Sequence, residues 1–473
     1  MKRKSIIAIL LIVVLYMVSN TSCKKERLLT SGGELKYSTD TLTFDTVFTS
    51  LGSFTVQVKI YNPQNQKINI SRIWLDGTDA SFFHLNVNGI PGNDVSNIEL
   101  AAKDSMYVFA TVTVNPNNSD NPFVVSAMLN ASMNGKNYEL PFMAYGQNAH
   151  YINGDSVGGQ TWGIADKKPY VVIDGAIVER GKTLTISKGT RVYMHAGALL
   201  YVDGTLTIDG TKSDSVIFQG DRLDRSYFGN VGYPGEWGGL YFTPYSTKST
   251  IKYGVFRNCG GGALHAGIYL APDSLHSGYQ LQMNYCTLDN SIGYGIISYH
   301  GSLQMQNCLI SNCGAQNLAT PLGGVYDIDN CTFVTYGNKK LSHTDNPVMA
   351  LVNYYDINDN DYRSDTLIAR LRNCIIWGTL DKELFINGKS PGAYYAELDN
   401  CLIKYANDPI PSLLTMNNCI TNQDPKFVDY NTGNYKLQAG SPAIDKGINL
   451  PNIIDDLDGK PRGAQTDIGC YEY

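Results

Sequence analysis

The stretch Leu303-Gln304-Met305-Gln306-Asn307-Cys308 decides the fold, because its pattern recurs along the second half of the chain. The pattern is a run of alternating apolar and polar residues that ends in Asn and Cys. The other copies are Val255–Cys259, Tyr326–Cys331, Ala369–Cys374, Glu397–Cys401 and Leu414–Cys419, with a weaker one at Leu281–Cys286. Their cysteines lie 27, 22, 23, 43, 27 and 18 residues apart, and 43 is nearly two periods of 22. A period near 22 with strand-like alternation predicts a solenoid whose coils are β-strands joined by turns.

The Asn and Cys of this pattern have separate physical roles. Equivalent positions of successive coils stack about 4.8 Å apart, so each position forms a column. Asn tolerates the left-handed backbone of a turn, and its amide can bond the Asn stacked next to it. Cys is small and readily buried, which predicts packing. A metal site would need close pairs such as Cys-x-x-Cys, and the chain has none, so we predict no metal centre.

Several strings at the start of this region resemble the first coils of bacterial right-handed parallel β-helix proteins. They are Ile173-Asp174-Gly175, Leu184-Thr185-Ile186, Leu199–Leu206 and Pro234–Phe242. The resemblance implies a pectate-lyase-like β-helix over residues 165–422. It implies little about function, because that fold carries lyases, hydrolases, epimerases and adhesins alike.

The N-terminus predicts export. Lys2, Arg3 and Lys4 precede the apolar run Ile6–Val18, which has the length of a signal-peptide core. Residues 1–22 are therefore expected to be a signal peptide, and the small residues before Cys23 resemble a bacterial lipobox. This resemblance implies lipidation of Cys23 and anchorage in a lipid bilayer. The charged residues Lys24-Lys25-Glu26 that follow resemble the surface-export signals of Bacteroidota lipoproteins, which implies an outer-membrane lipoprotein that faces the cell surface or the periplasm. Cleavage without lipidation is the alternative.

Composition narrows the partners. Loss of residues 1–22 removes three positive charges and moves the net charge from −6 to −9. An acidic chain without a basic run argues against nucleic acid as a partner. Nine cysteines follow Cys23, and an odd number cannot all pair, so no disulfide framework is predicted.

The part between the leader and the solenoid predicts a tether and a spacer. Residues 23–41 are polar, and residues 42–150 contain about seven short alternating runs, such as Phe54–Ile60, separated by Gly, Asn and Pro. This pattern predicts an immunoglobulin-like β-sandwich. It lacks the Cys and Trp of antibody domains and resembles the ASPM/HYDIN-type modules.

The last part of the chain, residues 423–473, predicts a cap. Gly440–Gly447, Asp456–Arg462 and Asp467–Tyr473 resemble the choice-of-anchor Q region that closes β-helix surface proteins. We expect this segment to cover the open end of the solenoid, since unpaired strand edges invite aggregation. Asp456, Asp458, Arg462 and Asp467 are expected to form a charged cluster there, and ion pairing is favoured over a calcium site because the EF-hand spacing is absent.

The search for catalytic residues finds no motif of the β-helix lyases or polygalacturonases. His265, Asp289 and His300 are the nearest candidates, but the two histidines are expected at opposite ends of stacked strands. Two loops depart from the coil period, Gly220–Glu236 and Asn338–Asp365. No cofactor is predicted. Calcium at the acidic run Asp356–Asp361 stays open as the alternative, because the run offers oxygen ligands but lacks the Gly and Glu of an EF-hand loop.

The first of these loops holds the candidate ligand-binding residues. Tyr227, Tyr233 and Trp237 lie in or beside it, and Tyr241 follows in the next strand. Aromatic side chains on loops can stack on sugar rings. The alternative interpretation is that they merely cover the coil.

The resulting hypothesis is an envelope lipoprotein whose β-helix binds or scaffolds a glycan or another envelope component. We favour binding over catalysis. One alternative is a polysaccharide lyase or glycoside hydrolase with a site in the groove beside Gly220–Glu236, and the other is a purely adhesive or structural solenoid. Convergent Asp, Lys or Arg residues would favour the enzyme, and a surface lined by Tyr and Trp would favour binding.

Overall fold

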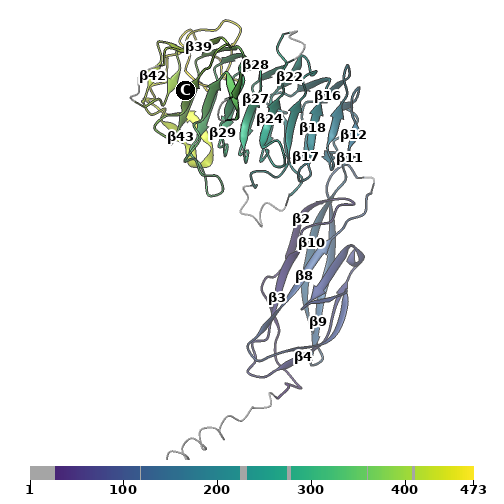
Figure 1. Cartoon of the computed structure of the whole chain (residues 1–473). Helices are drawn as coiled ribbons and strands as arrows, with labels where there is room; N and C mark the ends of the chain where they lie inside the picture. Colours follow the sequence, from purple (N-terminus) through teal and green to yellow (C-terminus); the bar gives the residue numbers. More distant parts are fainter. Residues whose placement is uncertain (1–26, 118, 224–231, 274–277, 359–360, 407–410) are drawn as a thin grey trace, which may run out of the picture. The chain divides into compact units, whose positions relative to one another are not determined.

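The chain folds into two units made almost wholly of β-strands. A computed structural model describes residues 27–473 except 118, 224–231, 274–277, 359–360 and 407–410. One unit comprises Met1–Asn117 and Pro122–Gln147, and the other comprises Asn118–Asn121 and Asn148–Tyr473 (Figure 1). No helix among the described residues is both long and apolar enough to cross a membrane.

The first unit is a β-sandwich of two five-stranded sheets. One sheet has, in spatial order, β1 (Lys36–Tyr37), β3 (Val56–Tyr61), β8 (Ser105–Val112), β5 (Phe83–Val87) and β6 (Ile90–Pro91). The other has β2 (Leu42–Phe48), β10 (Lys136–Gln147), β9 (Phe123–Met133), β4 (Ile68–Asp76) and β7 (Asp94–Leu100). A short 3₁₀ turn, η1 (Ala80–Phe82), precedes β5. Between the sheets, the rings of Phe44, Phe83 and Phe142 pack with centroids 5.3–5.8 Å apart, which anchors the core.

The second unit is a right-handed parallel β-helix, as predicted. Each coil passes through three sheets in turn, an 11-stranded, a nine-stranded and a ten-stranded one. The 11-stranded sheet contains β11 (His150–Ile152), β14 (Tyr170–Val172), β17 (Arg191–Met194), β20 (Val216–Gly220), β23 (Gly254–Arg257), β26 (Thr287–Asp289), β29 (Leu309–Ser311), β32 (Thr332–Thr335), β37 (Ile375–Gly378), β40 (Leu402–Ile403) and β42 (Ile420–Thr421).

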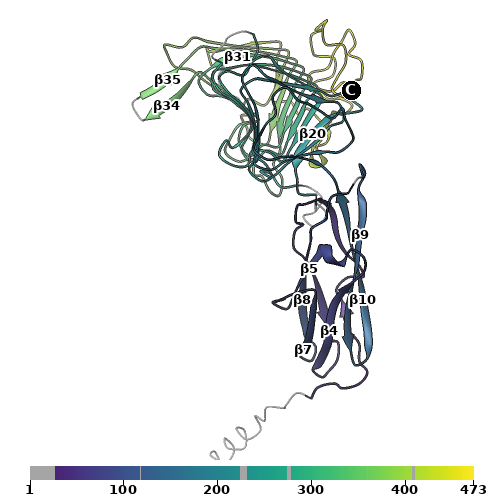
Figure 2. The ribbon, with the colours of Figure 1, turned by 90° about the vertical axis from the view of Figure 1, so that its right-hand side faces the viewer.

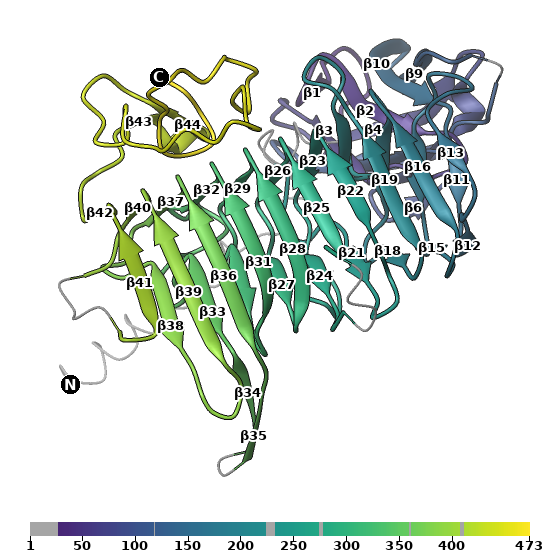
Figure 3. The same cartoon turned by 90° about the horizontal axis from the view of Figure 1, so that it is seen from above.

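The other two sheets follow the same stacking order (Figure 3). The nine-stranded sheet contains β12 (Asp155–Ser156), β15 (Ala176–Val178), β18 (Leu199–Val202), β21 (Gly239–Phe242), β24 (Ala266–Leu270), β27 (Tyr294–Ser298), β30 (Leu318–Thr320), β33 (Met349–Val352) and β38 (Leu384–Asn387). The ten-stranded sheet contains β13 (Thr161–Trp162), β16 (Thr183–Ser187), β19 (Thr205–Asp209), β22 (Ser249–Lys252), β25 (Leu281–Asn284), β28 (Gly301–Gln306), β31 (Gly324–Asp329), β36 (Leu367–Arg372), β39 (Tyr394–Asp399) and β41 (Leu414–Asn417).

Two short antiparallel strand pairs also belong to the second unit. A hairpin of β34 (Tyr354–Asn358) and β35 (Asp361–Ser364) projects from the coil between β33 and β36 (Figure 2). Near the C-terminus, β43 (Phe427–Asp429) and β44 (Asn434–Leu437) pair across the 3₁₀ turn η2 (Tyr430–Thr432).

The strands begin earlier than the sequence predicted in both units. Lys36–Tyr37 already pairs with β3, and Leu35 is buried, although residues 23–41 were expected to be a tether. The first strand of the β-helix is His150–Ile152, not a strand near residue 165. Short two- or three-residue strands lack enough alternation for a period to be recognised, and this explains both differences.

The corner after the ten-stranded sheet carries the main repeat. Its residues share a left-handed backbone, with φ between 48° and 55°: Tyr253, Tyr285, Asn307, Asn330, Asn373, Asn400 and Asn418. In Leu281–Cys286 the ladder position is therefore Tyr285, not Asn284, and its ring stacks on Tyr253 with centroids 4.8 Å apart. The next residue is a buried Cys in most coils, and the Cys286 N–H points to the Cys308 Sγ at 3.4 Å.

The prediction of one column is wrong for Val255–Cys259. Its Asn258 follows β23 and lies at another corner, between the 11-stranded and nine-stranded sheets, where it stacks with Asn290 and Asn312. The Asn290 amide donates to the Asn258 Oδ1 at 2.5 Å. Both corners require a residue with positive φ followed by a small buried one, so the pair Asn-Cys occurs in the sequence at each corner.

The cysteines are packing residues, as expected. All nine described cysteines are free thiols, and all but Cys419 are buried. Burial raises the pKa of the Cys259 thiol to about 12, so this thiol stays neutral at physiological pH.

The C-terminal segment, residues 423–473, does not make its buried contacts where we expected. Its apolar side chains pack on the outward-facing residues of the 11-stranded sheet, along the side of the solenoid rather than over its open end (Figure 3). The sheet residues in this cluster are Leu309, Val334, Ile375, Trp377 and Leu402, and the segment residues are Phe427, Tyr435, Leu437, Ala443, Leu457, Ile468 and Cys470. The outer face of the 11-stranded sheet is apolar, and its burial under the C-terminal segment is favourable. The segment therefore covers this sheet and not the open end of the solenoid.

The asparagine ladder holds this segment in place. The Asn373 amide donates to the Ile448 carbonyl at 2.8 Å and accepts from the Ile448 N–H at 2.8 Å. The amides of Asn307 and Asn400 donate to the carbonyls of Asp455 and Lys446. The predicted bond between stacked amides also occurs, since the Asn373 amide donates to the Asn330 Oδ1 at 3.3 Å.

The charged cluster of the C-terminal segment contains ion pairs, as the sequence predicted, but the acid that pairs with Arg462 is Glu472. Arg462 pairs with Glu472 at 2.6 Å, and both side chains are less than 10% exposed. The carboxylates of Asp456 and Asp467 are buried and accept backbone N–H groups, among them those of Glu472 and Tyr473. Asp458 pairs with Lys436 at 2.5 Å.

Replacement of Asn373 tests the ladder. Asn373→Ala removes both bonds to Ile448 and places a Cβ-bearing residue that lacks a polar side chain at φ 52°. We expect a loss of about 3 kcal/mol in the free energy of unfolding, measured by urea denaturation. The matched control is Asn418→Ala, because Asn418 has the same φ but is exposed; it should cost about 1 kcal/mol. Equal losses in the two variants would contradict a clamping role.

Candidate functional site

A row of tyrosines crosses the outer face of the nine-stranded sheet. Tyr201, Tyr241 and Tyr269 occupy the same register position in β18, β21 and β24, and Tyr299 follows β27. Successive ring centroids lie 5.5, 5.2 and 5.6 Å apart. Tyr355 of the hairpin extends the row at 6.2 Å from Tyr299. We call Tyr201, Tyr241, Tyr269 and Tyr299 the tyrosine row.

The row exists because alternate residues of a strand face opposite ways. In β21, Leu240 and Phe242 point into the core and are fully buried, so Tyr241 must point outward. Parallel strands in register repeat this choice from coil to coil. The rings turn relative to one another by 80°, 54° and 25°, so they present edges and hydroxyl groups as well as faces.

Tyr241, Tyr269 and Tyr299 of the row are neutral hydrogen-bonding groups at physiological pH. Burial raises the pKa of Tyr269 to about 12, and its neighbours Tyr299 and Tyr241 add to the effect. Burial also raises the pKa of Tyr241 and of Tyr299. Because Tyr201 is 39% exposed and the others are half-buried, their hydroxyl groups can serve a ligand laid on the sheet.

Apolar residues continue the surface beyond the row. Ile297 follows Tyr269 in register, and Ala319, Ala350 and Phe385 follow in later coils. The first three are nearly covered, whereas Phe385 is 42% exposed. Tyr269, Tyr294 and Tyr299 pack on this floor.

Charged pairs flank the first coils of the row. At one end of β18, Arg180 Nε donates to Asp203 Oδ2 at 3.1 Å, and the Arg180 guanidinium lies 3.4 Å from the Tyr245 ring centroid. Near the N-terminal end of β18, His195 Nδ1 lies 2.6 Å from Asp221 Oδ2. The four residues of β18 span roughly 10 Å, so these carboxylates do not converge on one bond.

The structure places three of the four predicted ligand-binding residues, Tyr233, Trp237 and Tyr241, in different surroundings. Trp237 is fully buried, stacks beside Phe218, and donates its indole N–H to the Arg257 carbonyl at 2.8 Å. Its predicted role as an exposed sugar platform is therefore wrong. Tyr233 is 43% exposed, but the Lys340 ammonium lies 3.7 Å from its ring centroid. Tyr241 is in the tyrosine row, and Tyr227 lies outside the described residues, as does Cys23.

The remaining candidates do not form a catalytic group among the described residues. His265 precedes β24 and His300 follows β27, at opposite ends of the sheet as expected. Asp289 lies on the 11-stranded sheet, where burial raises its pKa and Ser311 and Asn312 donate to it. Asn312 also donates to Tyr435 of the C-terminal segment, so Asp289 is part of that packing.

The second departing loop has structural partners. The His343 Nε2 lies 3.0 Å from each Glu383 oxygen, and both side chains are almost fully buried. Glu383 also accepts the N–H groups of Val348 and Leu380, so it fixes the loop to the next coil. In the hairpin, Asp356 pairs with Lys389 at 2.5 Å. The described residues hold no cluster of three or more His, Cys, Asp or Glu side chains suited to a metal.

Sequence reasoning missed three members of the row, Tyr201, Tyr269 and Tyr299. The sequence did contain a signal for them. Tyr201 and Tyr269 each follow a Leu or Ile that the coil period would place in the core, and Tyr299 comes directly after such a strand. An alignment of the coils on their inward residues, instead of on the Asn-Cys pair, would have stacked Tyr201, Tyr241 and Tyr269.

Comparison with known proteins identifies no family. No family model matches the chain, and no curated protein matches it. Among solved structures, the catalytic unit of a GH87 α-1,3-glucanase from Streptomyces thermodiastaticus is 12% identical with a TM-score of 0.26, and the match covers 77% of this chain and 88% of that one.

Two further structures are similar over shorter parts of the chain. The ASH/PapD-like domain 7 of human CEP192 matches 27% of this chain and 94% of that domain, at 13% identity and a TM-score of 0.17. A family 123 glycoside hydrolase from Clostridium perfringens matches 25% of this chain at 9% identity and a TM-score of 0.18, and the match spans about a quarter (26%) of the hydrolase. TM-scores this low carry no functional argument, so the function of this protein is inferred from the arrangement of its own side chains.

The contrast between Trp237 and Tyr233 can be tested directly. Trp237→Ala removes a fully buried indole and its hydrogen bond, and we expect it to cost about 3–5 kcal/mol of unfolding free energy. Tyr233→Ala removes an exposed ring and a contact with one ammonium, and it should cost about 1 kcal/mol or less. Thermal denaturation of both variants measures the difference. A Trp237 variant as stable as the parent would contradict the buried placement.

Proposed function

We propose that this protein is a glycan-binding protein of the bacterial envelope, and that the tyrosine row is its binding surface. The observation that carries the proposal is the row itself, four phenol rings spaced 5.2–5.6 Å apart along the solenoid axis. A surface with one repeat per coil suits a ligand that is itself a linear repeat, and a polysaccharide chain is such a ligand. Aromatic edges and faces contact sugar C–H groups, while phenol hydroxyls bond sugar hydroxyls.

The flanking charges support binding rather than cleavage. Asp203 is engaged by Arg180 and Thr243, and these bonds lower its pKa against the opposing effect of burial. A general acid needs a carboxyl group that keeps its proton near neutral pH, which is the opposite tendency. The Arg180–Asp203 and His195–Asp221 pairs suit a polar rim that orients hydroxyl groups beside the row.

A polysaccharide-binding experiment tests the proposal. Soluble chain lacking the leader is run through gels that contain neutral or acidic polysaccharides, and retardation reports affinity. We expect Tyr241→Ala with Tyr269→Ala to weaken retardation at least tenfold, since each ring contributes about 1 kcal/mol or more. The control is Tyr395→Ala, a 64% exposed tyrosine of β39 on the ten-stranded sheet.

The same samples separate binding from catalysis. Each retained polysaccharide is assayed afterwards for new reducing ends and for absorbance from unsaturated sugar. An intact polymer agrees with the proposal. Cleavage that survives in the double tyrosine variant would contradict it and favour a hydrolase or lyase, and equal retardation of the parent and the double variant would rule out the row as the binding surface.

We also propose that lipidated Cys23 anchors the protein. The basic residues Lys2–Lys4, the apolar run and the small residues before Cys23 support this proposal. Cys23→Ala should move the full-length protein from the membrane fraction to the soluble fraction, and metabolic labelling with a fatty acid should be lost. The control is Cys419→Ala, which removes a partly exposed thiol far along the chain. Membrane retention of the Cys23 variant would contradict the anchor.

A further inference from the structure

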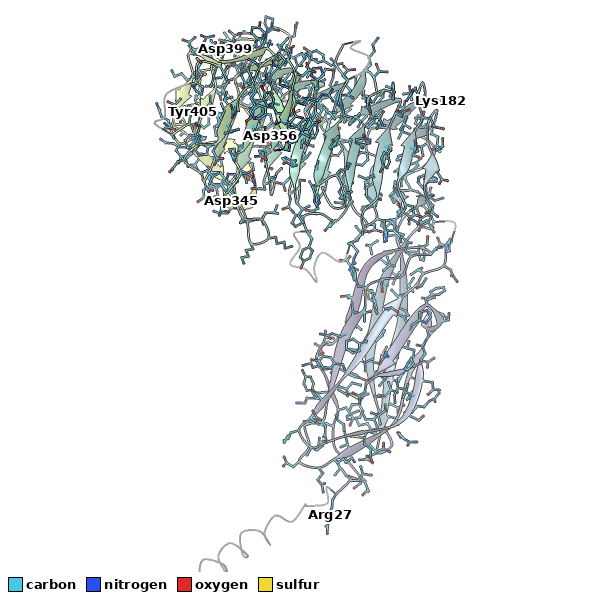
Figure 4. All side chains as sticks on the ribbon, viewed as in Figure 1. Arg27, Lys182, Asp345, Asp356, Asp399 and Tyr405 are labelled. Atoms are coloured by element: carbon cyan, nitrogen blue, oxygen red, sulfur yellow. The ribbon has the colours of Figure 1, made fainter. Side chains whose placement is uncertain are left out.

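A hollow lies where the last coils meet the start of the C-terminal segment. It has two lobes, with volumes of about 590 and 490 Å³. Trp377, Lys404 and Asp424 line both lobes, so the lobes share a wall. Ligand sites for small molecules have volumes of roughly 300–1,000 Å³, and each lobe by itself falls within that range. It lies near Tyr405, at the end of the β-helix remote from Lys182 (Figure 4).

Aromatic rings form the walls of the larger lobe. Trp377 comes from β37, and only 7% of its surface is exposed. Tyr336 stacks on Tyr430 with centroids 4.2 Å apart, and Phe427 closes the side. Burial raises the pKa of Tyr336, and the nearby Asp424 carboxylate adds to this effect. The wall therefore combines ring surface with a neutral phenol.

The charged groups of the hollow are balanced and partly unused. Lys404 Nζ donates to the Gly378 carbonyl at 3.0 Å, which occupies one of its three N–H groups. Asp424 accepts the N–H of Lys426. Lys404 and Asp424 line the same lobes, yet no ion pair joins them. With Lys426 and Asp381, the hollow offers two ammonium and two carboxylate groups.

This combination favours a neutral polyhydroxylated ligand over an ion. A phosphate would meet two carboxylates, and a metal cation would meet two ammonium groups, so the charges oppose either one. A pyranose ring has a face of C–H groups for the ring of Tyr430, which is 46% exposed, and hydroxyls that both donate and accept. Lys404 can donate to such hydroxyls and Asp424 can accept from them.

We infer that this hollow binds a terminal pyranose unit or a disaccharide of a neutral glycan, as a second site distinct from the tyrosine row. The tyrosine row belongs to the nine-stranded sheet, whereas the hollow borders the 11-stranded sheet. The inference deepens the proposed glycan-binding function, but it does not depend on the row, because none of the hollow's lining residues belongs to it.

Saturation-transfer NMR with single sugars tests the inference. The probes are glucose, galactose, mannose and N-acetylglucosamine at millimolar concentration, added one at a time to the soluble full mature chain. We expect at least one to receive saturation, and Lys404→Met and Asp424→Asn each to reduce that transfer at least fivefold. Both variants keep the side-chain volume, and thermal denaturation shows whether they remain folded. Lys446→Met, an exposed lysine outside the hollow's lining, is the matched control and should leave the transfer unchanged.

The outcomes distinguish this site from the row. Tyr241→Ala with Tyr269→Ala should leave single-sugar transfer intact, and Lys404→Met should leave polysaccharide retardation intact. No transfer from any of the four sugars, or transfer that neither hollow variant reduces, would overturn the inference while leaving the row untouched.

Discussion

The left-handed corner after the ten-stranded sheet is the constraint on which the β-helix depends. A chain that leaves one sheet must turn sharply into the next, and only residues that tolerate positive φ allow the turn without strain. In this corner the backbone N–H of each ladder residue from Tyr253 to Asn400 also donates to the coil that follows, as Asn330 does to Arg372. The corner thus fixes the register between coils. Once register is fixed, every position repeats, and a column of thiols inside and a row of phenols outside both follow.

The same ladder connects the coils to the C-terminal segment. Because the amides of Asn307, Asn373 and Asn400 turn outward to the segment, the corner supplies hydrogen bonds where the 11-stranded sheet supplies apolar contact. Covering this sheet creates the aromatic hollow at the edge of the cover, around Trp377 and Tyr430. The tyrosines of the nine-stranded sheet stay half-exposed. One solenoid therefore carries two surfaces of different shape, a row of rings on a sheet and a hollow beside the C-terminal segment.

The class of fold could be predicted from the sequence because the period of a repeat gives the length of one coil. Asn307-Cys308 and its copies have the period of one coil, and a strand-like alternation precedes them. The sequence could not assign Asn258 to its corner, since both corners select the same residue types. It also misplaced Trp237, because Gly and Tyr around it suggested an exposed loop, whereas the ring fills the core beside Phe218. Prediction of the site requires knowing which face of its strand each side chain occupies, and this depends on the register between neighbouring coils.

The length dependence of oligosaccharide binding tests the central claim most directly. In a chain carrying Lys404→Met, so that the hollow does not contribute, calorimetry with a size series from the best polysaccharide measures affinity against the number of sugars. The account predicts that affinity rises with each added unit until the oligosaccharide spans the four tyrosines of the row, and then levels off. A single sugar that binds as tightly as the longest oligosaccharide would contradict a surface built to hold an extended chain.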